Sequence, residues 1–320
     1  MATTSFTMRA TLEGTQIARA QKRRQPSKST YVPVIKCQKE AAAKSVNLIN
    51  TGRRSMLMAG GALAAFGACP CLTCGGAAKA SEWSYGDLAG PPEWTGVCKT
   101  GTIQSPIDIQ PRAASLKAAT EANDFSFKYA KTCKNIVNSG HGVQVNFEPG
   151  SMATLGDRTL ELLQFHFHTP SEHTYKGKHT SMEVHLVHRD ITGGRDNGLA
   201  VLGALMLAKP GSAPNPVLAS TLANAPDVPG DANVRSQLRI DPTDLLPTRQ
   251  NLGYWNYSGS LTTPPCSEAV NWFVFGDPVE ISSEQVVKFQ ELLGNGKTLS
   301  LNNRPVQPSV DRALTGYLYI

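Results

Sequence analysis

Short segments in which apolar and polar residues alternate recur between residues 143 and 187. Residues 143–147, 165–168 and 183–187 each follow this period of two, which is typical of strands that pack one face against a core. Residues 199–207 form a continuous apolar run, as expected of a strand buried on both faces. The pattern predicts a sheet-dominated domain with long loops.

Helical signals are few. The clearest begins at Ser282, where Gln285 is placed for a capping box, and ends at Gly294. A second short helix is expected near residues 216–223, inside a connection rich in Pro, Gly, Ala and Asn. Because no internal repeat and no heptad pattern interrupts the region, residues 81–320 are expected to form one domain.

Charge is distributed unevenly along the chain. The first 80 residues contain 12 of the 31 Lys and Arg residues but only two of the 25 acidic residues. The remaining 240 residues therefore hold 19 basic and 23 acidic residues, a net charge of −4. This body gives no electrostatic reason to expect a nucleic acid as partner.

The basic N-terminal region has the composition of targeting signals. Residues 1–52 are rich in Ser, Thr, Ala, Arg and Lys and nearly free of acids, which predicts a chloroplast transit peptide. Residues 53–80 begin with two arginines, continue with an uncharged run and end in an Ala-x-Ala sequence, which predicts a twin-arginine-type export signal cleaved before Ser81. Two signals in series indicate the thylakoid lumen. A transmembrane anchor is the alternative, although the strongly apolar part is shorter than the ~20 residues that a bilayer requires.

The seven cysteines divide in the same way. Those in the presequence are Cys37, Cys69, Cys71 and Cys74. The last three have a spacing that suggests a metal site, but their place in a segment predicted to be removed favours an incidental pattern. Cys98, Cys133 and Cys266 remain, and two of them can pair in a compartment that permits disulfides.

Histidines are concentrated on the predicted strands. His166 and His168 are two residues apart, so both project from one face, and His185 on a neighbouring strand offers a third imidazole. Three His ligands leave tetrahedral zinc a fourth position for water, as in catalytic sites. Gln164 and Glu183 each stand two residues before one of these histidines, where they can orient the rings. Histidines of surface strands without any metal are the alternative.

Seven motifs occur in an order that resembles the alpha-class carbonic anhydrases. They are QSPIDI at 104–109, NSGHG at 138–142, QFHFH at 164–168, SEHT at 171–174, EVHLVH at 183–188, SLTTPPC at 260–266 and NNRPVQP at 302–308. The similarity extends over about residues 83–308, and its closest known setting is an algal or plant chloroplast member exported to the lumen. Thr169 and Pro170 depart from a common Trp-Gly of the family, and Asn303 departs from a common Trp.

The resemblance implies a fold and an activity. The fold is mainly β (α+β), a single domain around a large, mostly antiparallel central sheet with few short helices, and residues 81–320 are the catalytic domain. The activity is that of a zinc lyase, the reversible hydration of CO₂ to bicarbonate and a proton by attack of zinc-bound hydroxide. Zinc makes its bound water acidic enough for this near neutrality, a property taken over from these enzymes themselves. The expected role is to supply CO₂ from bicarbonate in the thylakoid lumen for photosynthetic carbon concentration.

The resemblance also assigns roles to residues. His166, His168 and His185 bind Zn²⁺, with Gln164, Glu183 and the backbone carbonyl of Asn302 as acceptors for their other ring nitrogens. Three residues take part in the reaction itself. Thr262 orients the hydroxide and donates its own proton to Glu172, and His141 carries protons to buffer, since an imidazole titrates at moderate pH.

Three further groups of residues follow from the same resemblance. The pocket for nonpolar CO₂ is lined by Val187, Val201, Leu261, Thr263 and Trp272. The water chain is ordered by Tyr85, Ser139 and Gln144. Cys98 and Cys266 form a disulfide that joins the N-terminal segment to the loop of Thr262, which is worth up to ~5 kcal/mol in the chain-entropy model, and Cys133 stays unpaired.

Three rival functions remain open at this point. Some family members lack a zinc-binding histidine and act as binding modules, but all three histidines are present here. A zinc hydrolase acting on esters is a second rival. A lumenal assembly protein with incidental activity is the third, and peripheral association with the thylakoid membrane or a photosystem is a related expectation.

Overall fold

The computed structural model describes residues 83–86, 88–120, 123–194, 198–230, 232–233, 238–248, 253–294, 296, 298, 300–309 and 311–318. The predicted transit peptide, the export signal or transmembrane alternative, and the four cysteines of the presequence lie outside these residues. Within the described ranges, no helix has the length and apolar character needed to cross a membrane.

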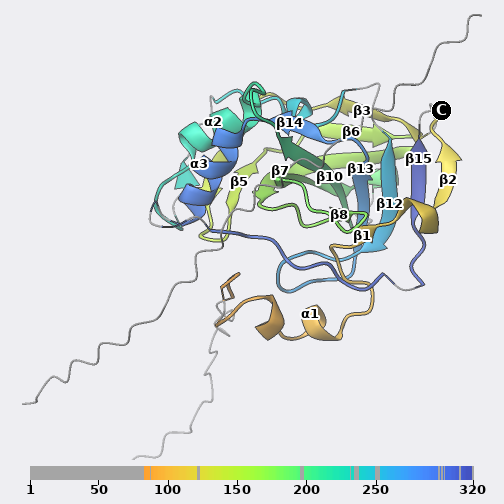
Figure 1. Ribbon diagram of the computed structural model, residues 1–320. Coiled ribbons are helices and arrows are strands. Elements are labelled where there is room, and N and C mark those ends of the chain that lie inside the picture. The colour runs from red at the N-terminus through yellow and green to blue at the C-terminus, as the bar shows by residue number, and fades with distance from the viewer. Residues whose placement is uncertain are drawn as a thin grey trace, which may run out of the picture. The chain divides into compact units, whose positions relative to one another are not determined.

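A large curved sheet dominates the part of the chain that the structure describes (Figure 1). Its central path runs, in spatial order, through β11 (Ala232–Asn233), β4 (Asn135–Asn138), β5 (Val143–Asn146), β7 (Arg158–His168), β9 (Met182–Asp190), β10 (Leu199–Ala208), β13 (Val270–Phe275), β12 (Tyr254–Gly259), β15 (Thr315–Leu318) and β2 (Ser115–Ala118). Three more strands join it from the side: β3 (Phe125–Lys128), β6 (Met152–Leu155) and β14 (Val279–Ile281).

Most neighbouring strands of this sheet are antiparallel, which confirms the expected fold class. The parallel neighbours are β10 with β13, β10 with β14, and β15 with β2. A separate parallel pair is formed by β1 (Asp108–Ile109) and β8 (Thr174–Tyr175).

The helices of the described residues are short, as predicted, and they lie around the sheet (Figure 1). They are α1 (Val97–Thr100), α2 (Pro216–Asn224) and α3 (Ser283–Leu293), with 3₁₀ turns η1 (Pro91–Glu93), η2 (Pro111–Ala113), η4 (Thr192–Gly194) and η5 (Pro242–Leu245). Ser282 and Gln285 form the reciprocal capping box at the start of α3, and Gly294 caps its end. Asn215 begins α2 by accepting hydrogen bonds from two backbone N–H groups.

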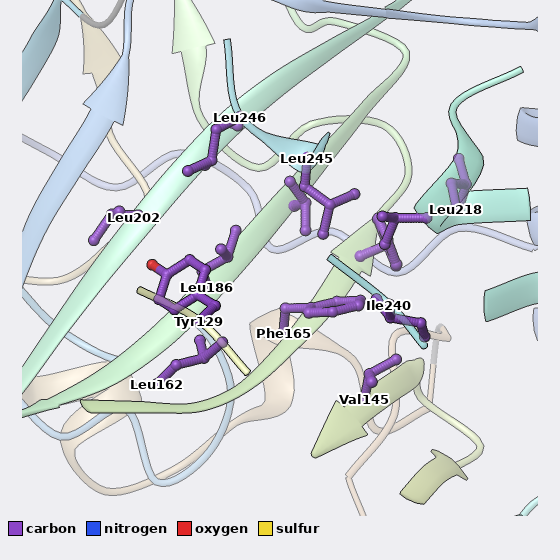
Figure 2. Close-up of a cluster of buried hydrophobic side chains, with 14 of the residues drawn as sticks. Tyr129, Val145, Leu162, Phe165, Leu186, Leu202, Leu218, Ile240, Leu245 and Leu246 are labelled. Atoms are coloured by element: carbon purple, nitrogen blue, oxygen red, sulfur yellow. The ribbon is translucent and has the colours of Figure 1, made fainter. Parts of the chain in front are cut away.

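The two faces of the central strands enter different apolar clusters. Leu186 of β9 and Leu202 of β10 lie in the larger cluster, part of which Figure 2 shows. Their chain neighbours Val187 of β9 and Val201 of β10 lie in the smaller cluster on the other face. The continuous apolar sequence of β10 therefore arises because both of its faces are buried, as expected.

A bulge in β7 decides which face its histidines occupy. Before the bulge the even-numbered Leu160 and Leu162 lie in the larger cluster, and after it the odd-numbered Phe165 and Phe167 lie there. The register shifts between Leu162 and Gln164, which inserts one extra residue. Because side chains alternate along a strand, this extra residue moves the later even-numbered positions to the opposite face. The histidines at 166 and 168 are thus turned away from the larger apolar cluster.

Candidate functional site

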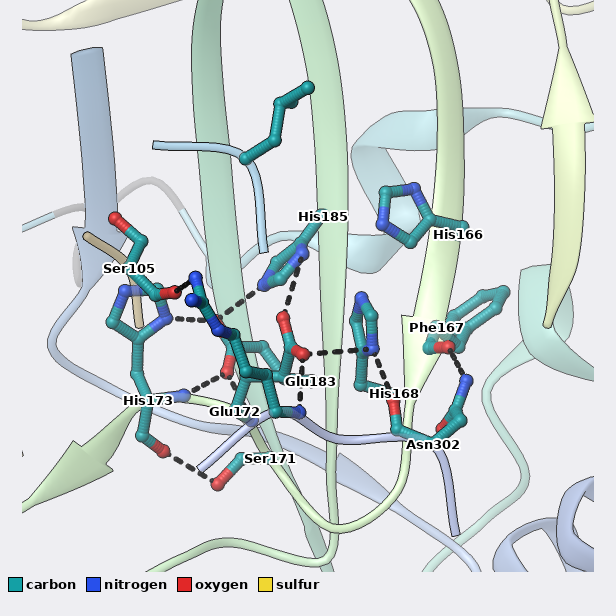
Figure 3. A network of polar contacts seen from close by, with 12 residues as sticks. Ser105, His166, Phe167, His168, Ser171, Glu172, His173, Glu183, His185 and Asn302 are labelled. Carbon is teal, nitrogen blue, oxygen red and sulfur yellow. Dashed lines mark hydrogen bonds and ion pairs between the residues drawn. The ribbon is translucent and has the colours of Figure 1, made fainter. Parts of the chain in front are cut away.

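Three histidines from two adjacent strands converge on this face. His166 and His168 come from β7, and His185 comes from β9 directly opposite His166 in the antiparallel register. One nitrogen of each ring lies within 4.8 Å of the corresponding nitrogens of the other two. The ring centroids are 4.6 to 5.3 Å apart (Figure 3).

Each ring uses its other nitrogen in a hydrogen bond to one of the acceptors predicted from sequence. His166 Nδ1 lies 2.8 Å from Gln164 Oε1, and His168 Nδ1 donates to the backbone oxygen of Asn302 at 2.7 Å. His185 Nε2 lies 2.9 Å from Glu183 Oε1. These bonds set the tautomers, so that the lone pairs of His166 Nε2, His168 Nε2 and His185 Nδ1 remain for a metal ion.

The donor set fits a zinc ion. Burial lowers the pKa of all three imidazoles, that of His168 to about 4, and the rings therefore stay neutral as ligands must. The Nε2 atom of His168 is buried and has no hydrogen-bond partner. A buried acceptor without a partner is costly in a folded protein, and a coordinated cation removes that cost.

His173 has no role that follows from the sequence, yet its ring contacts Glu183, which in turn orients His185. Its Nδ1 lies 2.7 Å from Glu183 Oε1, and its Nε2 lies 2.6 Å from the Tyr257 hydroxyl, so both ring nitrogens are already engaged. His173 with Glu183 and His185 forms a second group of clustered donor atoms, but it offers no free nitrogen for a metal. The only sequence signal was its place inside the SEHT motif.

Glu183 is fully buried and held from several directions. Its Oε2 accepts hydrogen bonds from the backbone N–H groups of Glu172 and His173 at 2.9 and 2.8 Å. Burial raises the pKa of Glu183, but its electrostatic interactions and hydrogen bonds with the His173 and His185 rings outweigh this and hold that pKa well below its usual range. Glu183 is therefore an ionised acceptor that fixes the orientation of His185.

Glu172 lies behind the three histidines. Its Oε1 accepts a hydrogen bond from the Arg304 backbone N–H at 2.8 Å and is 3.5 Å from His168 Nδ1. Burial raises the pKa of Glu172 to about 7, while His185 and the nearby Thr262 hydroxyl act in the opposite direction. The other oxygen, Oε2, makes no hydrogen bond of normal geometry. The predicted Thr262–Glu172 pair is thus brought together, although its hydrogen bond is not closed.

A cavity of about 350 Å³ opens in front of the histidines. All of the predicted pocket residues line it, and so do the residues predicted to order water: Val187, Val201, Leu261, Thr263, Trp272, Tyr85, Ser139 and Gln144. The Trp272 ring packs edge-on against His185, with 4.8 Å between ring centroids. A larger hollow of about 770 Å³ between α2 and α3 contains no histidine, so size alone does not locate this site.

His141 lines the same cavity, on the loop between β4 and β5. Its ring is stacked on Trp83, with centroids 3.9 Å apart and an interplanar angle of 21°. The side-chain amide of Asn302 donates to the backbone oxygen of His141 at 3.1 Å and to that of Phe167 at 2.9 Å. The loop of His141 is therefore attached to the strand that carries His166 and His168.

Cys98 and Cys266 form the expected disulfide, and Cys133 is buried and unpaired. Thr169, one of the departures from the family pattern, is buried and directly follows His168, the last residue of β7. The buried Thr169 backbone N–H donates to Asn302 Oδ1 at 2.8 Å, so polar contacts satisfy this position.

Comparison with known proteins gives a consistent result. The family profile described as eukaryotic-type carbonic anhydrase matches residues 89–317. Carbonic anhydrases from Nostoc sp. and from Pectobacterium carotovorum are each 37% identical to this chain, over 248 and 234 residues. These alignments cover 76% and 71% of this chain and 88% and 87% of those proteins.

Solved structures are similar over nearly their whole length. Carbonic anhydrase Cah3 from Chlamydomonas reinhardtii, in complex with acetazolamide, is 42% identical, with a TM-score of 0.66 over 74% of this chain and 100% of that chain. The alpha-carbonic anhydrase from Thermovibrio ammonificans, in complex with sulfanilamide, is 39% identical, with a TM-score of 0.64 over 73% and 98%. The chain therefore belongs to the alpha-class, or eukaryotic-type, carbonic anhydrases, a family of zinc enzymes that catalyse the hydration of CO₂.

Proposed function

We propose that His166, His168 and His185 hold the zinc ion with which this carbonic anhydrase interconverts CO₂ and bicarbonate. The observation that carries the proposal is that one nitrogen of each of the three neutral rings points to a common position. The other nitrogen of each ring is hydrogen-bonded to the protein. Bound zinc supplies the Lewis acidity that makes water a nucleophile near neutral pH, a property known from carbonic anhydrases themselves.

Thr262 and Glu172 orient the nucleophile in this proposal. Glu172 is held by the Arg304 backbone N–H and lies near the Thr262 hydroxyl, whose hydrogen bond it would accept once that contact closes. A hydroxyl that donates to a carboxylate leaves its own oxygen as an acceptor. Thr262 would then accept a hydrogen bond from the attacking oxygen and direct its lone pair toward carbon.

The apolar wall of the cavity receives the substrate. Val187, Val201 and Trp272 are buried and border the cavity beside His185. CO₂ has no net dipole and gains from leaving water for such a surface. The wall is at the same time part of the smaller apolar cluster of the sheet, so one set of side chains serves both stability and binding.

His141 relays the proton that hydration releases. It lines the cavity together with the three histidines, and Tyr85, Ser139 and Gln144 line the same cavity. Imidazole is the side chain suited to accept and release protons at moderate pH, so His141 can exchange protons with buffer.

The two predicted targeting signals support action in the thylakoid lumen, and the Cys98–Cys266 disulfide is compatible with an oxidising compartment. If the lumen is acidic, protons favour the conversion of bicarbonate to CO₂, so the proposed net role is to supply CO₂ for photosynthetic carbon concentration. Isotope exchange measured from about pH 5 to about pH 8 tests this, because collapse of bicarbonate dehydration below about pH 6 contradicts it. Salt washing of isolated thylakoids tests the proposed peripheral association with the membrane or a photosystem.

Zinc content and substrate preference test the enzymatic proposal directly. We expect about one zinc per purified chain and CO₂ hydration that is lost on chelation and restored by zinc. Turnover of a model ester that far exceeds CO₂ hydration would instead support the ester hydrolase. A fully zinc-loaded protein without either activity would support the binding module.

A further inference from the structure

The side chain of Arg304 is buried, and the hydrogen bonds of its guanidinium go to residues 98–105. Its Nη1 donates to Gln104 Oε1 at 2.9 Å and to the Ser105 backbone oxygen at 2.8 Å, and its Nη2 donates to the Cys98 backbone oxygen at 2.8 Å. The guanidinium also lies 5.6 Å from the ring centroid of Trp94. A buried charge is costly unless it is hydrogen-bonded, and the N–H groups of a guanidinium have a fixed planar geometry. These hydrogen bonds therefore hold the Arg304 side chain in one orientation.

The main chain of the same residue contacts the catalytic centre. The Arg304 backbone N–H donates to Glu172 Oε1, and this is the hydrogen bond that holds the carboxylate. Arg304 therefore contacts Glu172 with its backbone and residues 98–105 with its side chain.

Residues 98–105 are in turn bonded to the loop of Thr262. The Ser105 backbone N–H donates to Ser260 Oγ at 2.9 Å, and the Ser260 backbone N–H donates back to Ser105 Oγ at 3.0 Å. Gln104 Nε2 donates to the Cys266 backbone oxygen at 3.1 Å, and the Cys98–Cys266 disulfide joins the same two segments covalently. Both ends of the 260–266 loop are thus fixed to the segment that Arg304 binds.

We propose that Arg304 is a positioning residue that sets the separation of Glu172 and Thr262. Glu172 is attached to the common segment through Arg304, and Thr262 is attached to it through Ser105 and Gln104. The proposal rests on the roles proposed above for Glu172 and Thr262. An error of about 1 Å in such an arrangement can cost about 100-fold in rate, so a distant side chain can control the chemistry.

Arg304→Met and Arg304→Lys test the proposal in the full-length protein. Met removes the charge and the donors, while Lys keeps the charge but lacks the planar fork that reaches three acceptors. We expect unchanged zinc stoichiometry, because no zinc ligand bonds to the Arg304 side chain. We expect kcat/KM for CO₂ hydration to fall about 10- to 100-fold, with a smaller fall in the buffer-limited kcat.

Arg312→Met is the matched control. Arg312 Nη1 donates to the Gln104 backbone oxygen at 2.7 Å, so it also binds residues 98–105, but it has no hydrogen bond to Glu172. We expect this variant to keep the kcat/KM of the parent protein. A loss equal to that of Arg304→Met would overturn the proposal, since it would show that any weakening of the segment has the same effect.

A double-mutant cycle with Glu172→Gln gives the decisive readout. If Arg304 acts through Glu172, Arg304→Met has little further effect on the residual kcat/KM once Glu172 is changed. Additive losses would overturn the proposal, as would equal falls in kcat and kcat/KM that follow the folded fraction. If Arg304→Met does not fold, the same cycle with Arg304→Lys decides. Inactivity of the zinc-loaded parent protein would instead refute the proposed function. That outcome differs from a failure of the Arg304 proposal, in which the parent protein is active.

Discussion

His166 of β7 and His185 of β9 are direct cross-strand neighbours, with ring centroids 5.3 Å apart and ring planes at 90°. Neighbouring side chains on one face of an antiparallel pair are close enough to share a ligand. His168 completes the group from two residues along β7. The candidate metal site therefore lies on two neighbouring strands in the middle of the sheet, and strands position side chains more precisely than loops do.

His185→Ala is expected to abolish both zinc retention and CO₂ hydration. Only His166 and His168 would remain as ligands, and a catalytic zinc site needs three protein ligands. Zinc stoichiometry after dialysis and stopped-flow CO₂ hydration measure the two effects. His179→Ala is the control, since His179 is exposed and not among the clustered donors. Full zinc binding by His185→Ala would contradict the assignment of this ligand.

Gly203→Ala is expected to weaken zinc binding without removing a ligand. Gly203 lies opposite His185 on β10, and a Cβ there would be 3.0 Å from Glu183 Oε1. Displacement of an acceptor that orients a metal-bound histidine typically costs about 10- to 100-fold in affinity. Competition with a fluorescent zinc chelator measures it. Gly276→Ala is the control, because a Cβ there meets its nearest neighbours at 3.5 Å.

His141→Ala is expected to slow proton transfer to buffer while it spares CO₂ conversion itself. The loss in kcat at low buffer concentration should reach up to about 100-fold, whereas kcat/KM should change little. Free imidazole added to the variant should restore part of the rate. An equal fall in kcat and kcat/KM without chemical rescue would indicate that His141 only supports the loop beside Trp83.

Cys98→Ser is expected to lower the free energy of unfolding by about 2–4 kcal/mol, because the disulfide closes a long loop in the unfolded chain. Urea unfolding with and without reductant measures this, and reductant should have little further effect on the variant. Cys133→Ala controls for loss of a cysteine, since Cys133 is buried and unpaired. Catalysis should fall as well, because the bridge anchors the loop of Thr262. Unchanged stability of Cys98→Ser would contradict the prediction.

Acid is expected to destabilise the fold through His188. This residue lies beside Tyr129, and burial lowers its pKa to about 4, although hydrogen bonds that its ring donates to the backbone at Leu186 and Ala200 act in the opposite direction. The unfolded chain binds a proton there below about pH 6.5, while the folded chain does not until about pH 4. Stability should therefore decline by about 3 kcal/mol across this window as pH falls.

His188→Gln isolates this contribution, because glutamine can still bond to the Tyr129 hydroxyl but does not titrate. Chemical unfolding at several pH values should show a flatter decline for the variant than for the parent chain. Equal slopes in the two proteins would show that other groups cause the acid sensitivity.

Local patterns in the sequence were sufficient for β5, β7, β9 and β10 and for the ends of α3. The period of two around His166 and His185, and the unbroken apolar run of β10, record which faces are buried. The capping box at Ser282 is equally local, because its hydrogen bonds join residues three apart. The convergence of His166 and His168 could be predicted for the same reason, because residues two apart on a strand share a face.

Other features depend on contacts between distant parts of the chain. No local pattern announces the bulge in β7 that turns His166 and His168 toward the cavity, since its position follows from pairing with two neighbouring strands. The double engagement of His173 by Glu183 and Tyr257 likewise joins residues up to 84 positions apart. Neither was expected from the sequence.

Local sequence patterns were enough for the strands around His166 and His185, for the family resemblance and for three candidate metal ligands. The arrangement of Glu172, Thr262 and Arg304 relative to one another followed only from the folded chain. Alternation and capping act over a few residues, whereas Arg304 bonds to groups about 200 positions earlier in the chain. Such contacts exist only once the whole sheet has closed around them.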